Sequence, residues 1–337
     1  MASIALSRTR LHLPGLVAAC AAVMLATVLS RLVPALSPAV IAVTAGATLS
    51  NLGWLPDAVR PGLQFVAKRV LRVAIVLLGL QIAVPEVLGL GAGTLGIVAA
   101  ATGTTFVLTP LIARRLGLSP GTGLLVGTGV SICGAAAVAA MRSATDTDDD
   151  EAAGALSVVV LYGSAAIVVV PLLAGWLGLS PQQLGVWTGA SVHEVAQVAA
   201  IGAASGASVL TIAVTVKLAR VVLLAPMVAI TSFRLAAGRR QGQEGPMGTR
   251  QAPPVMPLFV GGFLAMVALR SLGWAPAPVV ESAPQVTALL LAASLFGLGA
   301  GIDLRRLATG GRPLLLLGAI STALIMAISL VGVTLAT

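Results

Sequence analysis

Long apolar runs, separated by short polar stretches, extend along the chain from residue 13 to residue 336. A hydrocarbon core about 30 Å thick requires roughly 20 apolar residues in each helical span. Runs of this kind, with proline or glycine at most junctions, predict an all-α membrane protein of about eleven transmembrane helices. The expected spans are 13–31, 36–50, 69–86, 94–114, 121–141, 153–178, 184–205, 208–233, 256–273, 284–303 and 313–336.

The composition indicates that the whole chain belongs to the membrane. Of 337 residues, 58% are hydrophobic and 9% are charged, whereas about a quarter of the residues in a soluble domain are charged. Residues 1–337 are therefore expected to form a single polytopic membrane domain. The longest polar stretch, 237–254, is basic and rich in glycine and glutamine. We expect it to be a flexible cytoplasmic linker between two halves.

The net charge of +9 does not indicate a nucleic-acid partner, because aromatic residues are only 3% of the chain and the basic residues lie at the ends of apolar runs. Basic residues gather in the cytoplasmic loops of membrane proteins. With a cytoplasmic N-terminus, fifteen basic residues fall on the cytoplasmic side and three (Arg31, Arg142 and Arg270) on the other. The pattern predicts a multi-pass inner-membrane protein with a periplasmic C-terminus. The fifteen are Arg8, Arg10, Arg60, Lys68, Arg69, Arg72, Arg114, Arg115, Arg234, Arg239, Arg240, Arg250, Arg305, Arg306 and Arg312.

An acidic run at 146–151 falls in an outward loop of this topology. A solvated loop is the favoured interpretation, and a divalent-cation site is the alternative. Cys20 and Cys133 lie within apolar runs without the spacing of a metal or redox pair. No cofactor, metal site or disulfide is expected.

The expected span 184–205 carries His193, Glu194 and Gln197 near its midpoint. Glu194 and Gln197 are three residues apart and therefore lie on one face of a helix. A charged residue at the centre of a membrane helix costs roughly 2.5–3.5 kcal/mol. Such a face must meet protein or a water-filled cavity, so we expect Glu194 and His193 to take up and release protons or another coupling ion.

Lys217 and Arg220 lie about halfway along the next span, three residues apart. With Glu194 they leave a surplus positive charge, which suits a small anion, provided that the three side chains face a common hydrated chamber. The alternative is that Glu194 pairs with one cation while the other extends toward the membrane interface.

A glycine-rich segment at 127–134 interrupts the fifth expected span. Each glycine costs about 1 kcal/mol relative to alanine in a helix interior, so the segment is able to unwind and expose helix termini that bind anions. Thr128, Gly129 and Ser131 are the candidate ligands here; close packing of small residues is the alternative. The sequence GVSICGAAAVAA from Gly129 also matches GASVHEVAQVAA from Gly189 at six of twelve positions. A second weak match, between the segments that begin at Leu77 and Leu295, implies a different repeat unit. No repeat is therefore assigned.

At these motifs the chain resembles the bacterial sulfate exporter family of the cation/proton antiporter and anion transporter superfamily. The resemblance rests on GTGVSICGAAAVAA at 127–140, HEVAQV at 193–198, VKLARVVLLAP at 216–226 and LGAGIDL at 298–304. Where relatives often carry His-Asp, this chain has His193-Glu194. The resemblance implies an inverted-repeat transporter fold with broken helices in a core domain beside a panel domain.

The leading hypothesis is a secondary transporter that exports a small oxyanion (sulfate, sulfite or an organosulfonate) by alternating access. Lys217, Arg220, Ser131, Thr128, Gly129 and Gln197 are the expected substrate ligands, and a proton or sodium ion is the coupling ion. The first alternative is a coupled carrier of a cation or organic solute. The second is a membrane hydrolase, which is disfavoured because His193 lacks a second histidine at helical spacing. No catalytic residue is therefore expected, and a homodimer is left open.

Overall fold

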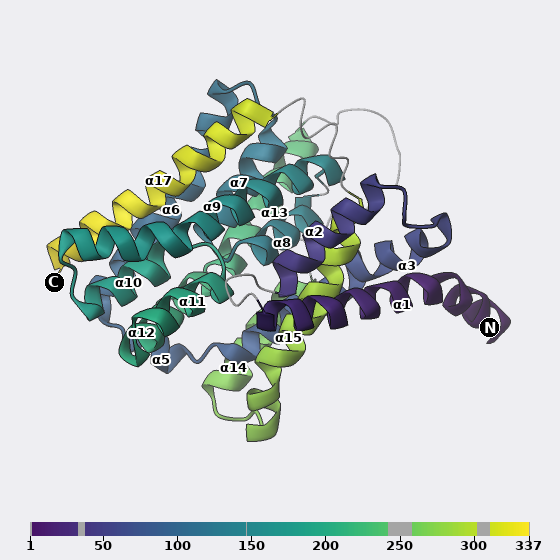
Figure 1. The fold of residues 1–337 in the computed structure, drawn as a ribbon, viewed down its shortest axis with the longest axis horizontal. Helices are drawn as coiled ribbons and strands as arrows, with labels where there is room; N and C mark the ends of the chain where they lie inside the picture. The colour runs from purple at the N-terminus through teal and green to yellow at the C-terminus, as the bar shows by residue number, and fades with distance from the viewer. Residues whose placement is uncertain (1, 33–37, 146, 242–257, 302–310, 337) are drawn as a thin grey trace.

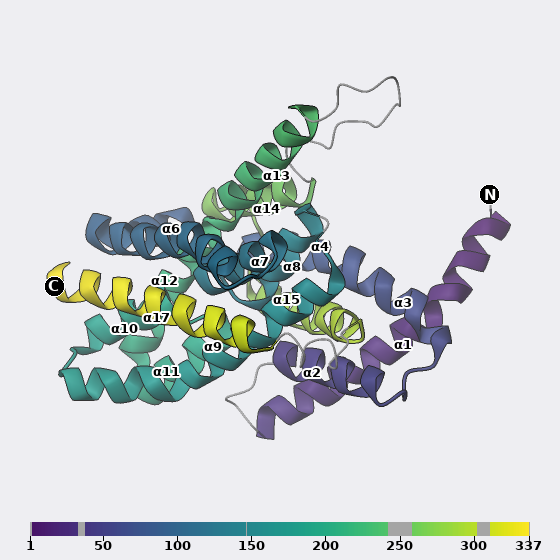
Figure 2. The ribbon, with the colours of Figure 1, turned by 90° about the horizontal axis from the view of Figure 1, so that it is seen from above.

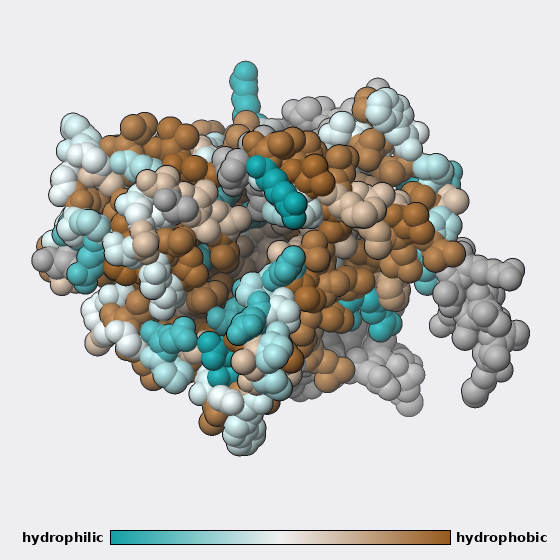
Figure 3. All heavy atoms as spheres, turned by 60° about the horizontal axis from the view of Figure 1, so that its bottom comes forward, coloured by the Kyte–Doolittle hydropathy of each residue, from teal (hydrophilic) through white to brown (hydrophobic). Residues whose placement is uncertain are grey.

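The computed structural model describes residues 2–32, 38–145, 147–241, 258–301 and 311–336, and within these ranges the regular elements are all helical. Six helical segments there are long and apolar enough to cross a membrane: His12–Leu32, Gly91–Arg115, Asp149–Leu177, Ala207–Leu235, Ala277–Gly299 and Gly311–Ala336. The face in Figure 3 carries broad hydrophobic areas, as lipid contact requires. The protein is therefore an all-α, multi-pass membrane protein.

The first part of the chain forms α1 (Ala2–Leu32), α2 (Pro38–Asn51) and a helical run that crosses the molecule in several pieces. The pieces are η1 (Asp57–Val59), α3 (Arg60–Phe65), the π-helical turn η2 (Val66–Val70), α4 (Leu71–Leu78) and η3 (Gly79–Gln81). Later in the chain, α14 (Leu258–Ser271) and α15 (Ala277–Gly299) pack against these helices. We call α1 to η3, α14 and α15 together the panel body.

The middle of the chain and its end form the second group of helices. It contains α6 (Gly91–Arg115), α7 (Pro120–Ser131), α8 (Ala135–Thr145), α9 (Asp149–Leu177), α10 (Pro181–Ser191), α11 (Val195–Ser205), α12 (Ala207–Val222) and α17 (Gly311–Ala336). We call this group the hairpin body. Figures 1 and 2 show α1, α2, α3 and α15 toward the N-terminal side and α6, α10, α11, α12 and α17 on the other side.

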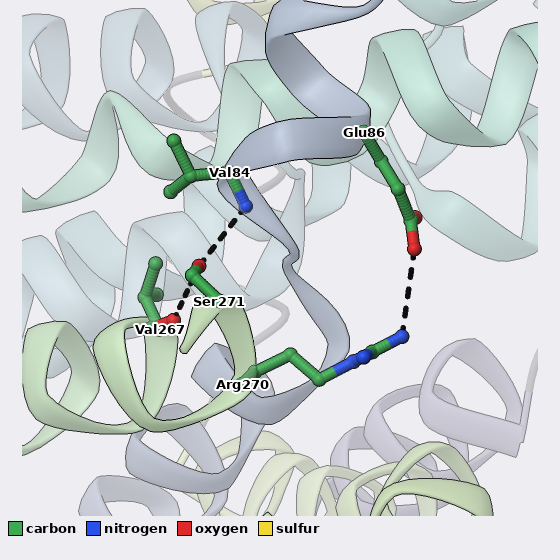
Figure 4. A network of polar contacts seen from close by, with 5 residues as sticks. All are labelled: Val84, Glu86, Val267, Arg270 and Ser271. Carbon is green, nitrogen blue, oxygen red and sulfur yellow. Dashed lines mark hydrogen bonds and ion pairs between the residues drawn. The ribbon is translucent and has the colours of Figure 1, made fainter. Parts of the chain in front are cut away.

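Short α5 (Val84–Leu88) connects the panel body to α6 and is held against α14. The backbone N–H of Val84 donates to Ser271 Oγ at 3.0 Å, and the Ser271 hydroxyl donates to the Val267 carbonyl at 2.7 Å (Figure 4). Beside them, Arg270 and Glu86 form an exposed ion pair at 3.5 Å. Helix α13 (Leu224–Gln241) leads from α12 back to the panel body.

Helices α7 and α8 form a hairpin that enters the molecule and returns to the end from which it started. Gly121 and Glu151 lie side by side, as do Gly129 and Val159, so α7 runs parallel to α9. The hydroxyl of Ser119 also bonds to the Glu151 carboxylate. Since α7 and α9 start at the same end, α8 must run backwards between them. The expected single span at 121–141 is therefore wrong.

Helices α10 and α11 form a second hairpin from the opposite end. Gly185 and Gly189 contact Ile212 and Val216, so α10 runs parallel to α12. Gly202 lies against Leu210 across the turn at Gly206, so α11 is antiparallel to α12. The sequence leaves open whether 184–205 crosses the membrane or re-enters, and the structure shows a segment that re-enters. The apolar run has the length of a span, but hydrophobicity alone does not reveal that the chain reverses at residues 192–194.

Both hairpins begin with the same five residues, LGLSP, at 116–120 and at 177–181. Gly117 and Gly178 take positive φ angles of 74° and 65°, the conformation that commonly ends a helix. Ser119 and Ser180 then cap α7 and α10, with proline at the first helical position of each. This repeated motif is the signal in the sequence that marks the two hairpin entrances.

The first hairpin changes the expected topology. Arg142 pairs with Asp149, and the two line a polar pocket of about 140 Å³ together with Arg60 and Lys68. Arg142 and the acidic residues 148–151 thus lie at the basic end of the molecule, and their expected outward position is wrong. Because the first hairpin returns, α9 runs opposite to the direction expected for the span at 153–178. The second hairpin also returns, so the spans that follow it keep their expected directions.

Several expectations fall partly outside the described residues. The expected linker at 237–254 begins within α13, which extends to Gln241, and its remainder, 242–254, lies outside them. Residues 302–304 of the LGAGIDL motif also lie outside them.

Candidate functional site at the hairpin tips

Helices α7 and α10 end in the interior of the protein, and their last carbonyl groups converge on two cations of α12. Arg220 donates to the carbonyls of Val130 (2.7 Å), Ser131 (3.1 Å), Gly189 (3.1 Å) and Val192 (2.8 Å). Lys217 donates to the carbonyls of Ile132 at 2.5 Å and Val192 at 2.8 Å. The last carbonyls of a helix have no partner within it, and these two side chains supply one for both hairpins.

Lys217 and Arg220 are completely buried. The negative ends of the α7 and α10 dipoles stabilise these two cations. Glu194 is the nearby carboxylate that offsets the positive charge behind the tips.

Glu194 lies in the tip of the second hairpin, against Gly134 in the tip of the first. A Cβ atom at Gly134 would lie 2.6 Å from Glu194 Cγ, and Gly134 has a φ of 74°, so this position requires glycine for space and for conformation. In the alignment of GVSICG with GASVHE, Gly134 occupies the place of Glu194. The glycine of one tip thus accommodates the carboxylate of the other.

Gln197 and His193 hold the tip of the second hairpin. Glu194 caps α11 in a capping box in which its side chain accepts from the backbone of Gln197, and its own N–H donates to Gln197 Oε1 at 3.0 Å. His193 Nε2 lies 3.0 Å from the Thr322 hydroxyl on α17. Both side chains are buried, and these contacts fix the direction of the Glu194 carboxylate.

A cavity of about 270 Å³ lies between the hairpin tips and the panel body. From the tips it is lined by Cys133, Glu194 and the first residues of α8 and α11, and from the panel body by residues of α2, α4, η3 and α15. Ser50 bonds to the Ala300 carbonyl, so α2 and α15 end together near the basic end and begin at the other. Since Pro38, Gln81 and Pro284 line the cavity, it extends from the tips away from the basic end.

Of the predicted site residues, Glu194 alone lines this cavity. Lys217 and Arg220 lie behind the tips, sealed by backbone carbonyls, so the expected common chamber of the three charges is not present in this structure. Thr128 donates to the Leu124 carbonyl at 2.7 Å, and Ser131 to the Thr128 carbonyl at 3.4 Å. With Gly129, both are buried inside the first hairpin.

Three polar residues of the cavity, Gln81, Cys133 and Thr287, were not predicted as site residues, and neither was Gly134 in the first tip. Gln81 and Thr287 are isolated polar positions within apolar helices of the panel body, which is the signal that points to them. Among the described residues, no three histidine, cysteine or carboxylate side chains lie together as ligands of a metal ion.

The family model described as conserved hypothetical protein 698 matches residues 14–318. The chain belongs to this family. A UPF0324 membrane protein of Corynebacterium glutamicum is 41% identical over 324 residues, covering 96% of this chain and 92% of the relative. UPF0324 membrane protein TauZ of Paracoccus denitrificans is 34% identical, covering 86% of each chain. Another UPF0324 membrane protein, from Bacteroides thetaiotaomicron, is 31% identical over 83% of this chain and 84% of its own. The two hairpins and the cavity lie within the part that the family model matches.

Proposed function

We propose that the protein is a secondary transporter that carries a small anion through the cavity at the hairpin tips, with Glu194 as the proton-binding group. The observation that supports it most directly is the position of Glu194, which lines the cavity while two buried cations lie behind it. Buried charges within a membrane are rare and mark the routes of ions and substrates.

The charges at the tips couple the proton to the anion. With Glu194 ionised, its negative charge offsets part of the surplus positive charge of Lys217 and Arg220 behind the tips. With Glu194 protonated, the surplus remains and attracts an anion toward the N-termini of α8 and α11. Proton and anion then bind together, and neither binds well alone.

The arrangement of the two hairpins supports transport by alternating access. The LGLSP motifs, followed by hairpins that enter from opposite ends, support an inverted-topology repeat. Transporters with such repeats bind substrate near the middle of the membrane, where helices are discontinuous. We assign the basic end to the cytoplasm of the inner membrane, with the N-terminus inside. The cavity then faces the periplasm, and the structure is in an outward-facing state.

Proteoliposomes that contain a trapped pH-sensitive dye test the proposal. Addition of sulfate, sulfite, or short organic carboxylates and sulfonates is expected to start a proton movement for at least one anion, and Glu194→Gln abolishes it. Glu281→Gln is the matched control, because Glu281 is an exposed acid on α15 outside the cavity. The proposal fails if no anion of this panel moves protons, or if Glu194→Gln behaves like Glu281→Gln.

The position of Glu194 also favours a second candidate, a carrier of a cation or organic solute in which Glu194 and Gln197 bind the coupling ion. Sodium-dependent thermal stabilisation of the wild type that Glu194→Gln removes, without any anion-driven proton movement, supports this candidate instead.

A further inference from the structure

The walls of the cavity are mostly apolar. Twelve of its sixteen lining residues are proline, alanine, valine or leucine, and the other four are Gln81, Cys133, Glu194 and Thr287. An inorganic oxyanion gives up its hydration on entering such a site and finds few donors in return. An anion with an apolar part gains from the same walls, because apolar surface leaves water.

The hairpin tips supply Cys133 and Glu194 to the wall of the cavity, and the panel body supplies Gln81 and Thr287. Ala135 and Val195 are the first residues of α8 and α11, and both line the cavity. Two helix N-termini, each with a positive dipole end, therefore meet it beside Glu194. The N–H of Gln197 in α11 is bonded to the Glu194 side chain, and that of Ala137 in α8 is bonded to the Gly134 carbonyl. Leu78, Leu291 and Leu295 of the panel body supply most of the larger apolar side chains.

The Thr287 hydroxyl on α15 indicates a missing partner. Thr287 is 1% exposed and lines the cavity, and its Oγ1 has no hydrogen-bond partner within the described part of the chain. A buried hydroxyl without a partner is costly. Thr128 avoids this cost by donating to a backbone carbonyl one turn away. In this structure Thr287 Oγ1 is itself covered, so donation to a bound ligand requires the side chain to turn toward the cavity that Thr287 lines.

The size of the cavity limits the ligand. At about 270 Å³ it lies just below the range of about 300–1,000 Å³ that drug-sized ligands occupy. It has more room than a tetrahedral oxyanion needs and suits an acidic head with a chain of a few carbons.

We infer that the substrate is a small organic anion whose acidic head lies at the N-termini of α8 and α11 and bonds to Thr287, while its short apolar chain lies against α4 and α15. This inference rests on the proposed function and narrows its substrate class to organic acids, in preference to inorganic sulfate.

A series of alkane sulfonates of increasing chain length tests the inference on a protein with an unchanged cavity. In a Cys20→Ser background, Cys133 is the remaining cysteine, and it lines the cavity. Binding is measured as protection of Cys133 from a maleimide. We expect sulfate to protect least, and protection to rise about three- to four-fold per methylene from methanesulfonate to propanesulfonate, before it falls for chains that are too long. Ala288→Leu, which fills part of the cavity, shifts the optimum to a shorter chain.

Thr287→Val removes the proposed donor with little change of shape. We expect it to weaken protection by propanesulfonate about ten-fold or more, while Thr287→Ser keeps most of it. Thr105→Val is the matched control, because Thr105 is equally buried and without a partner for Oγ1 among the described residues, but lies outside the cavity lining.

Failure of the inference is distinct from failure of the proposed function. If sulfate moves protons through Glu194 and protects Cys133 as well as propanesulfonate does, the inference is wrong and the transporter stands. If Thr287→Val and Thr105→Val have equal effects, the assignment of the head group is wrong. If no anion of the panel moves protons, the proposed function itself is wrong.

Discussion

Replacing Arg220 by methionine is the most direct test of how the hairpin tips are held. The guanidinium bonds to four carbonyls of two helix ends, and Lys217 shares one of them, that of Val192. Methionine leaves the other three carbonyls without a donor in a site from which water is excluded. Each unsatisfied group costs about 1–3 kcal/mol, partly offset because a buried positive charge is removed. We expect a loss of about 3–5 kcal/mol in the free energy of unfolding.

Thermal unfolding in detergent measures this loss, with Trp187 as an intrinsic reporter. Its indole is buried on α10 and donates to the Met326 carbonyl at 3.0 Å. In a background where Trp54, Trp176 and Trp274 are replaced by phenylalanine, the fluorescence therefore follows the second hairpin. A loss of 3–5 kcal/mol corresponds to a decrease in Tm of about 5–10 °C for a chain of this size. Arg220→Lys keeps the charge but lacks the planar fork of donors. Its Tm is expected to lie between those of the wild type and Arg220→Met.

Arg312→Met is the matched control, because Arg312 is exposed at the start of α17. Its Tm is expected to remain close to that of the wild type. The reasoning is refuted if Arg220→Met lowers Tm by less than about 2 °C, because the carbonyls of the two tips would then be satisfied without the guanidinium.

The remaining predictions concern the tip, the connection of the two bodies and the open end. Gly134→Ala and Gly117→Ala both strain a positive φ by about 1–2 kcal/mol, but only the former forces a methyl group against Glu194; we expect Gly134→Ala to lose proton-coupled flux and Gly117→Ala to keep it. Glu86→Gln breaks the exposed ion pair between α5 and α14 and should change the unfolding free energy by less than about 1 kcal/mol in a denaturant titration. A membrane-impermeant thiol reagent is expected to label Cys133 from the periplasmic side faster than from the cytoplasmic side, and the reverse order would contradict the outward-facing assignment.

The contribution of the sequence is clearest for the membrane spans. Apolar runs of sufficient length predicted the helices observed at Gly91–Arg115, Asp149–Leu177 and Gly311–Ala336 within a few residues. Composition also predicted the all-α class, and the resemblance in motifs led to the family. The length of an apolar run and the charges at its ends are properties of consecutive residues, so the sequence alone is enough to predict the spans.

The direction of the chain within the membrane was decided by tertiary structure. Residues 121–141 and 184–205 have the length and hydrophobicity of spans, but each reverses at a short break near its centre. The reversal is stable because Lys217 and Arg220, from a helix that follows both hairpins, supply the donors that the broken ends lack. The sequence shows the helix breaks and the two basic residues at separate positions. Only the packing of α12 against the hairpin tips brings Lys217 and Arg220 to the free carbonyls.

Tertiary packing also explains why the predicted site differs from the observed one. The sequence identified His193, Glu194, Lys217 and Arg220 as buried polar residues, because charge within an apolar run is visible to inspection. It did not reveal that the two cations bind backbone carbonyls, since carbonyls are present at every residue and only their position at a helix end makes them free. Nor did it place Thr287 opposite Glu194. That cavity exists only where two bodies, distant in sequence, face each other.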